Sequence, residues 1–248
     1  NNGDLPVKVY NLGRQWYSSL HTLVNFETNL RQLKPDMIIV MHAYNDLLHN
    51  ADFSYLSNGP FRNDYGHFTG PVSDLLKPPQ GLITALAEKF RGMWYHRPRT
   101  VIKTDQFPGL VPYRRNLEIL LEIAAFDSTE IVLMTQPHLY SANMSDEIKE
   151  MCHMINIEAV GPEYQWDHST AYLGMLAYND AVRDIAKLRN IPLIDLEEEF
   201  PKSPDFFIDE VHYTDIGFDL MGKLVGNGLQ DILEKGFMKQ GDNGHPLR

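Results

Sequence analysis

Met37–Met41 has the sequence MIIVM, an unbroken apolar run that is too short for a helix. Such a run is typical of a strand that is buried on both faces of a parallel sheet. Upstream of it, residues 19–33 place apolar side chains at helical spacing, and residues 7–12 carry the β-branched and aromatic residues of a strand. Strand, helix and strand in this order predict a βαβ unit, whose functional groups gather at the carboxyl ends of parallel strands.

The alternation of helices and strands resumes in the second half of the chain. We expect helices at about residues 114–126, 146–157 and 170–189, strands at 130–135 and 191–196, and a terminal helix from the N-cap Thr214 to about Lys235. With 43% hydrophobic residues, the 248-residue chain can bury a substantial core. These features predict an α/β fold in a single domain that spans residues 1–248.

Residues 47–113 interrupt this alternation with recurring prolines and many aromatic side chains. We predict an insertion over the strand ends, with one amphipathic helix at about residues 81–95. Its aromatic content favours a functional segment, because aromatic side chains give a long loop area to bury. An aromatic plug that covers one end of the sheet without binding a ligand is the alternative.

Composition excludes several classes of partner. The formal net charge of -11 argues against nucleic acid and anionic membranes, because phosphate binding needs clustered Lys and Arg. No apolar run approaches the roughly 18 residues of a membrane span, which predicts a soluble chain. The single Cys152 cannot form an internal disulfide, so the redox compartment stays open. The oligomeric state is open as well. The first residue is Asn rather than Met, which indicates an upstream segment that was removed or omitted, as in secreted or periplasmic proteins.

Asp209 and His212 form an Asp-x-x-His pair just before the predicted terminal helix. This spacing lets the carboxylate reach the imidazole Nδ1, which fixes the tautomer and leaves Nε2 free to take a proton from a nucleophile. On its own, the pair also has an ordinary explanation, which is a chance Asp and His in a surface loop.

Two further residues stand where predicted strands end. Gly13 follows the strand at residues 7–12, and Asn45 follows Met37–Met41. Hydrolysis of an ester needs hydrogen-bond donors for the tetrahedral oxyanion, and the Gly13 backbone N–H and the Asn45 side-chain amide would supply two. Separately, a post-strand turn explains Gly13 and an Asx-turn explains Asn45. Their order and placement together favour an active site.

Asn11-Leu12-Gly13, Ala43-Tyr44-Asn45-Asp46 and Asp209-x-x-His212 in this order resemble the SGNH (GDSL-type) hydrolase family. The resemblance extends over about residues 7–224. It implies a three-layer α/β/α sandwich with five parallel strands in the order 2-1-3-4-5, in which residues 7–12 are strand 2 and Met37–Met41 are strand 3. It also implies a Ser-His-Asp site without metal or cofactor, with His212 and Asp209 as base and acid.

The chain departs from the family pattern in three places. Ala43 and Trp16 stand where the family often has glycine. The third departure is the nucleophile: the family's serine segment belongs on strand 1, before residues 7–12, and this chain does not contain it. Ser18 and Ser19 stand at a helix start, and no G-x-S-x-G elbow occurs. We therefore expect a serine upstream of Asn1, on a segment that fills the slot between residues 7–12 and Met37–Met41.

Other nucleophiles and metal ligands are less well supported. Cys152, next to His153, is best explained as part of a helix core, because adjacent helical residues point apart. The remaining histidines show no tight ligand spacing, so we predict no metal site; they include His42, His49, His67 and His138.

The sequence therefore predicts a serine-dependent ester hydrolase that acts on a small-molecule ester. An acylated sugar, a lipid and a thioester all stay open as substrates. One alternative is a serine-less relative that binds an acylated or glycan ligand without turnover, and another is an acyltransferase that uses the same site. The hydrolase is favoured because a binding module does not need Gly13, Asn45, Asp209 and His212 together.

Overall fold

The structure is a computed structural model that describes residues 7–14, 17–49, 100–152 and 164–242. The predicted insertion at residues 47–113 lies mostly outside these ranges, as does its predicted helix at 81–95. The single-domain organisation therefore stays a prediction.

The central sheet consists of three parallel strands, which are β1 (Met37–Met41), β3 (Glu130–Met134) and β5 (Leu193–Ile194), in the order β1-β3-β5. β1 and β3 pair along their whole length, from Met37 opposite Glu130 to Met41 opposite Met134. β2 (Thr100–Ile102) and β4 (Tyr164–Trp166) form a separate parallel pair. The order of the central strands agrees with strands 3, 4 and 5 of the expected fold.

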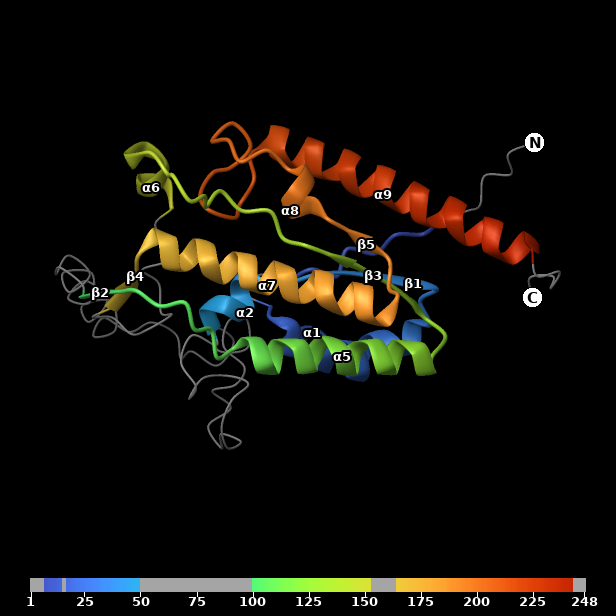
Figure 1. Cartoon of the computed structure of the whole chain (residues 1–248). Helices are drawn as coiled ribbons and strands as arrows, with labels where there is room; N and C mark the ends of the chain where they lie inside the picture. The colour runs from blue at the N-terminus through green and yellow to red at the C-terminus, as the bar shows by residue number, and fades with distance from the viewer. Residues whose placement is uncertain (1–6, 15–16, 50–99, 153–163, 243–248) are drawn as a thin grey trace, which may run out of the picture.

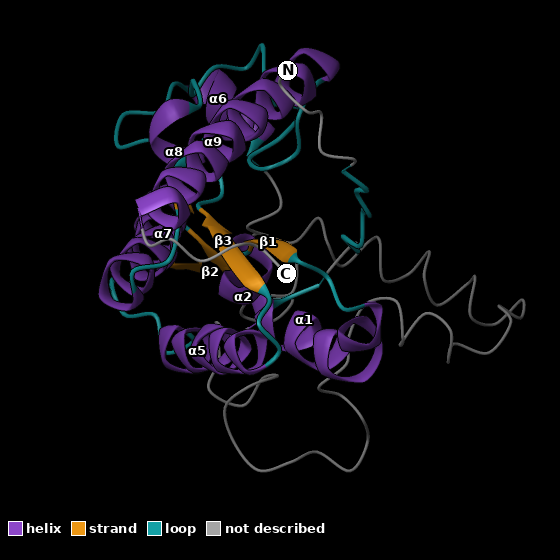
Figure 2. Cartoon of the chain, turned by 90° about the vertical axis from the view of Figure 1, so that its right-hand side faces the viewer, coloured by secondary structure: helices purple, strands orange, loops and turns teal. Residues whose placement is uncertain are grey.

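Helices cover both faces of this sheet (Figures 1 and 2). One side holds α5 (Leu110–Phe126), α7 (His168–Arg189) and α1 (Ser19–Asn25), which continues as a π-helical and a 3-10 turn through Leu33. The other side holds α9 (Asp215–Asp242), which also contacts the short α8 (Leu196–Glu199). Two shorter helices, α2 (Tyr44–His49) and α6 (Asp146–Met151), complete the described helices.

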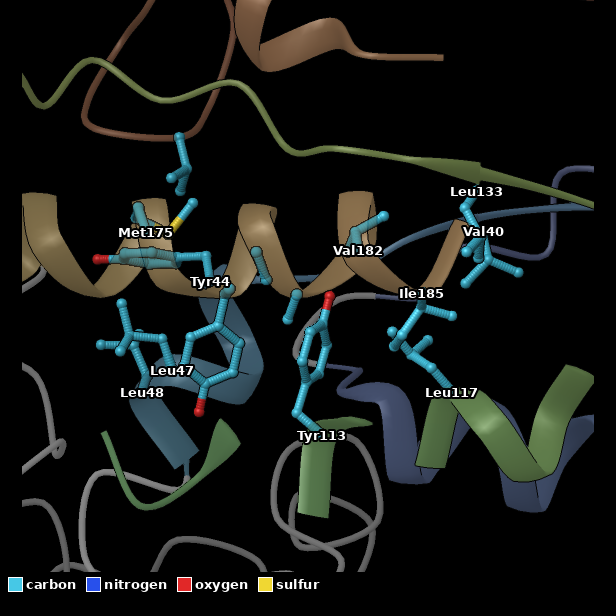
Figure 3. Close-up of a cluster of buried hydrophobic side chains, with 14 of the residues drawn as sticks. Val40, Tyr44, Leu47, Leu48, Tyr113, Leu117, Leu133, Met175, Val182 and Ile185 are labelled. Carbon is cyan, nitrogen blue, oxygen red and sulfur yellow. The ribbon is translucent and has the colours of Figure 1, made fainter. Parts of the chain in front are cut away.

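Alternating side chains of the central strands are buried in two separate hydrophobic cores, one on each face of the sheet. Val40 and Leu133 pack with residues of α5 and α7, as Figure 3 shows for Leu117, Val182 and Ile185. On the opposite face, Val132 and Ile194 pack with Leu196 and with the partly buried apolar side chains of α9, among them Leu224, Val225 and Leu229. Successive strand residues point to opposite faces of a sheet. The arrangement is therefore the predicted three-layer α/β/α sandwich.

The strand predicted at residues 7–12 is wrong. These residues are irregular, and Val7 and Val9 are exposed by 77% and 84%. A strand needs a neighbour to satisfy its backbone N–H and C=O groups, and none of the described strands pairs with this segment. The apolar alternation is thus present in the sequence, but the hydrogen-bonding partner that would make it a strand is not among the described residues.

β1 lies at one edge of the central sheet, because β3 is its only partner among the described strands. Its central residue, Ile39, is 41% exposed although the whole strand is apolar. The predicted slot beside β1 is therefore an edge open to water in the described structure, rather than a gap with buried unpaired groups. The last strand is also shorter than expected, since the chain turns into α8 at Leu196.

Candidate active site

The predicted contact between Asp209 and His212 is present. Asp209 Oδ2 lies 2.7 Å from His212 Nδ1, while Asp209 Oδ1 accepts the backbone N–H groups of Val211 and His212, both at 2.9 Å. The loop backbone thus fixes the orientation of the Asp209 carboxylate, independently of its contact with the His212 ring. The loop itself is closed by the Ile208 N–H, which donates to the His212 carbonyl at 2.8 Å.

Burial and hydrogen bonding shift the pKa values of Asp209 and His212 in opposite directions. Hydrogen bonding to Asp209 raises the pKa of His212 above its usual value, although partial burial opposes the shift. Burial alone would raise the pKa of Asp209, but the bonds from His212 and from the two backbone N–H groups outweigh it and lower that pKa. Because Nδ1 is occupied and the His212 side chain is 58% exposed, Nε2 is the nitrogen available to exchange a proton.

The second element of the site is Asn45, the second residue of α2. Its Nδ2 donates to the Tyr17 carbonyl at 2.9 Å, which ties α2 to the segment before α1. An Asn Nδ2 carries two N–H donors, so one remains available beyond this bond. The side chain is half-buried at the carboxyl end of β1, where the parallel sheet places functional groups.

Gly13 is less well placed than Asn45. It lies in the exposed segment 7–14, and its backbone N–H donates to Asn11 Oδ1 at 3.1 Å. In the described structure the proposed oxyanion donor is therefore engaged locally. The reason is the same one that removes the strand at residues 7–12, since none of the described strands pairs with this segment.

Two buried polar clusters flank these residues, and the sequence analysis did not predict either of them. Asp46, next to Asn45, accepts the Ser19 backbone N–H at 2.8 Å and the Ser19 hydroxyl at 2.5 Å. Glu210, next to Asp209, accepts the phenol hydroxyls of Tyr44 at 2.6 Å and of Tyr140 at 3.2 Å. Asp46 and Glu210 are each visible in the sequence as an acidic residue inside a motif. The residues that donate hydrogen bonds to them lie far away in the sequence, so the clusters could not be predicted.

Ser18, Ser19 and Cys152 are all buried, so none of them presents its side chain to a substrate from solvent. Ser18 and Ser19 are 1% and 2% exposed, and they are hydrogen-bonded to His21 and to Asp46. Cys152 is buried, which raises the pKa of its thiol to about 12. A thiol with such a pKa stays protonated at neutral pH and is a poor nucleophile.

Two histidines outside the loop of His212, His42 and His138, are held in neutral form. Burial lowers the pKa of His42 to about 4 and that of His138 to about 3. Within the described residues, no three His, Cys, Asp or Glu side chains gather as metal ligands would. None of the described helices is both long and apolar enough to span a membrane. The side chains of His49, His67 and His153 lie outside the described part of the structure.

Comparison with known proteins places the whole arrangement in context. The family model for GDSL-like lipases and acylhydrolases matches residues 2–225. A protein described as a GDSL-like lipase from Parabacteroides merdae matches with a TM-score of 0.50 and 14% identity, covering 89% of this chain and 72% of the other. No curated protein matches the sequence.

Two further solved structures show similar values. A GDSL-like lipase from Bacteroides thetaiotaomicron matches with a TM-score of 0.48 and 13% identity, over 88% of this chain and 73% of the other. A catalytic mutant of an acetylxylan esterase from Geobacillus stearothermophilus matches with a TM-score of 0.46 and 14% identity, over 86% and 68%. At such identities, similarity to a solved structure concerns the fold alone.

Proposed function

Because the chain belongs to the family of GDSL-like lipases and acylhydrolases, we propose that it forms the base and oxyanion side of a serine-dependent ester hydrolase. The Asp209–His212 pair carries this proposal. Its carboxylate is anchored by two backbone N–H groups, and its imidazole has one nitrogen held by the acid and the other available. This is the arrangement that activates a serine hydroxyl.

In the proposed reaction, His212 Nε2 takes the proton of a serine hydroxyl as the serine oxygen attacks the ester carbonyl. Asp209 stays ionised and stabilises the imidazolium that forms. The Asn45 amide donates to the oxyanion of the tetrahedral intermediate. His212 then gives its proton to the departing alkoxide, which leaves as an alcohol. Water, deprotonated in turn by His212, releases the acid from the acyl-serine and restores the site.

The proposed nucleophile is a serine on a segment upstream of Asn1 that pairs with the free edge of β1. Two observations support this placement: β1 has β3 as its one partner among the described strands, and the described serines beside the site, Ser18 and Ser19, are buried. In this arrangement the segment also gives residues 7–12 a neighbour and can turn the Gly13 N–H toward the oxyanion. The substrate is a small-molecule ester whose acyl and alcohol parts stay open.

A fluorophosphonate probe tests the proposed function, because it phosphonylates an activated serine and releases fluoride. We expect the source protein to be labelled on one serine outside residues 1–248, and His212→Ala to abolish the labelling. Asn45→Ala should lower kcat for short-chain esters by roughly 10²–10³ with little change in KM, since its bond forms mainly in the transition state. A label on a serine within residues 1–248, or labelling that survives in His212→Ala, would contradict the proposal.

A further inference from the structure

A buried hydrogen bond joins the two parts of the candidate site, which are the start of α2 and the loop of His212. The Tyr44 hydroxyl donates to Glu210 Oε1 at 2.6 Å, across 166 positions of the sequence. Tyr44 immediately precedes Asn45, and Glu210 immediately follows Asp209. The contact therefore connects the neighbour of the proposed oxyanion donor with the neighbour of the proposed orienting acid.

A contribution to folding stability does not by itself explain why a carboxyl group is buried at position 210. Glu210 is fully buried, and burial raises the pKa of its carboxyl while the Tyr44 bond opposes the rise. Oε1 accepts both Tyr44 and Tyr140, but Oε2 is buried without a hydrogen-bond partner among the described residues. Burying such a group is costly, and a well-packed apolar side chain of similar volume would commonly be as stable or more so.

The backbone groups of Tyr44 and Glu210 also form hydrogen bonds, both to the segment after β3. The Tyr44 N–H donates to Gln136 Oε1 at 2.9 Å, and the Glu210 carbonyl accepts the Leu139 N–H at 2.9 Å. Gln136 and Leu139 belong to the segment that follows β3. The start of α2, the segment after β3 and the loop of His212 are thus joined in one hydrogen-bond network.

We propose that Tyr44 and Glu210 form a positioning pair that sets the Asn45 amide in register with the Asp209–His212 dyad. Neither residue touches the reacting atoms. The pair acts by holding the start of α2 and the loop of His212 at a fixed separation. An acyl-transfer site requires this, because small misplacements of its groups are costly in rate. This inference rests on the proposed function for its kinetic consequence, but the coupling of the two loops does not depend on it.

Three substitutions separate the hydrogen bond from other effects. Tyr44→Phe and Glu210→Met each remove the bond while keeping similar volume. Glu210→Gln keeps a carbonyl oxygen that can accept the Tyr44 hydroxyl, and it removes the negative charge. Tyr178→Phe is the matched control, because Tyr178 is equally buried and its hydroxyl lies 3.5 Å from the Asp46 carbonyl rather than at Glu210.

NMR spectroscopy of the isotope-labelled chain measures the effect of each substitution on the residue at the other end of the contact, His212 or Asn45. We expect Tyr44→Phe to shift the ring resonances of His212 and Glu210→Met to shift the side-chain amide resonances of Asn45. Glu210→Gln should keep the Asn45 resonances at their wild-type positions, and Tyr178→Phe should leave His212 unchanged. If Tyr44→Phe does not move His212, or if Glu210→Gln perturbs Asn45 as strongly as Glu210→Met, the positioning pair is wrong. Tyr44→Phe decides the matter even if Glu210→Met fails to fold.

Kinetics of the form that carries the nucleophile provide the second test. Tyr44→Phe should lower kcat by about 10- to 100-fold with KM changed by less than about twofold, because misplaced groups lose transition-state rather than ground-state binding. The double variant Tyr44→Phe/Glu210→Met should lose no more than the worse single variant, since Glu210→Met already removes the bond that Tyr44→Phe removes. Additive losses would contradict the pair. An absence of ester hydrolysis in the wild type would contradict the proposed function instead, and the NMR test would still decide the coupling.

Discussion

At the scale of single residues, the site depends on how one carboxylate is held. Asp209 uses both oxygens: Oδ1 is occupied by the loop backbone and Oδ2 by the imidazole. The acid therefore cannot rotate away from His212 without giving up backbone bonds. The Asp-x-x-His spacing was sufficient to predict this contact, because its donors and acceptors lie within four residues of one another.

Replacing Asp209 should change the protonation of His212. We expect Asp209→Asn to lower the pKa of His212, because the hydrogen bond to Asp209 is the main cause that raises it and partial burial acts in the opposite direction. The stability that this raised pKa contributes is full below the unfolded value and is lost as the pH rises through the folded value. An NMR titration of the imidazole in this chain measures the shift. Asp205→Asn is the control, since Asp205 is exposed in the same loop, and an equal effect of both variants would contradict the role of Asp209.

A second pH effect belongs to Asp46. Burial raises the pKa of Asp46 from 3.8 to about 7, although its bonds from Ser19 oppose the rise. The folded state therefore binds this proton more tightly than the unfolded state does, and the stability from Asp46 falls as the pH rises from about 4 to about 7. Asp46→Asn should make the free energy of unfolding flatter over this range. Urea unfolding at several pH values measures it, with the exposed Asp219→Asn as control, and parallel profiles for wild type and Asp46→Asn would contradict the prediction.

At the scale of elements, the sequence predicted what is encoded locally. The apolar run at Met37–Met41 became β1, residues 170–189 became most of α7, and Thr214 caps the N-terminus of α9 by accepting the Gly217 N–H at 3.1 Å. The segment at residues 7–12 has an equally good strand pattern and is not a strand, because strand formation also needs a neighbour. The Tyr44–Glu210 contact was not predicted for a related reason, since a hydrogen bond across 166 positions leaves no periodic signal in the sequence.

The packing of α9 on the sheet gives a prediction with an internal control. A Cβ at Gly228 would lie 2.9 Å from Ile194 Cγ1 and 3.0 Å from Ile194 Cδ1, whereas a Cβ at Gly222 would meet nothing within 4 Å. Ile194 is buried and cannot move away easily. Gly228→Ala should therefore destabilise the protein by about 1–3 kcal/mol through overpacking. Gly222→Ala should stabilise it by about 0.5–1 kcal/mol, because alanine favours a helix interior more than glycine does.

Thermal or urea unfolding of the two alanine variants compares them directly. A loss of stability at both positions would mean that α9 does not tolerate the change for reasons of helix structure. A gain at both would mean that α9 does not pack against β5 as closely as the Gly228–Ile194 approach indicates.

At the scale of the whole molecule, one missing strand would account for two features, the edge of β1 and the irregular residues 7–12. Ile39 of β1 is 41% exposed, and none of the described strands pairs with the second side of β1 or with the exposed apolar alternation at residues 7–12. Neighbouring strands lie about 4.8 Å apart, so one intervening strand would separate the two segments by roughly 10 Å. Such a strand would satisfy the backbone of both and would cover Ile39, at a gain of about 25 cal/mol for each Å² of apolar surface removed from water.

We therefore expect a form of the protein that includes the proposed serine-bearing segment to differ from the present chain in one region of the sheet. Hydrogen exchange should slow at β1 and at residues 7–12 together, because a single inserted strand bonds to both. β3 already lies between two strands, so its exchange should stay unchanged and serves as the control. Protection of β1 alone would mean that residues 7–12 are not the second neighbour of the inserted strand. Protection that comes from direct pairing of residues 7–12 with β1 would exclude the slot and, with it, the position proposed for the serine beside His212.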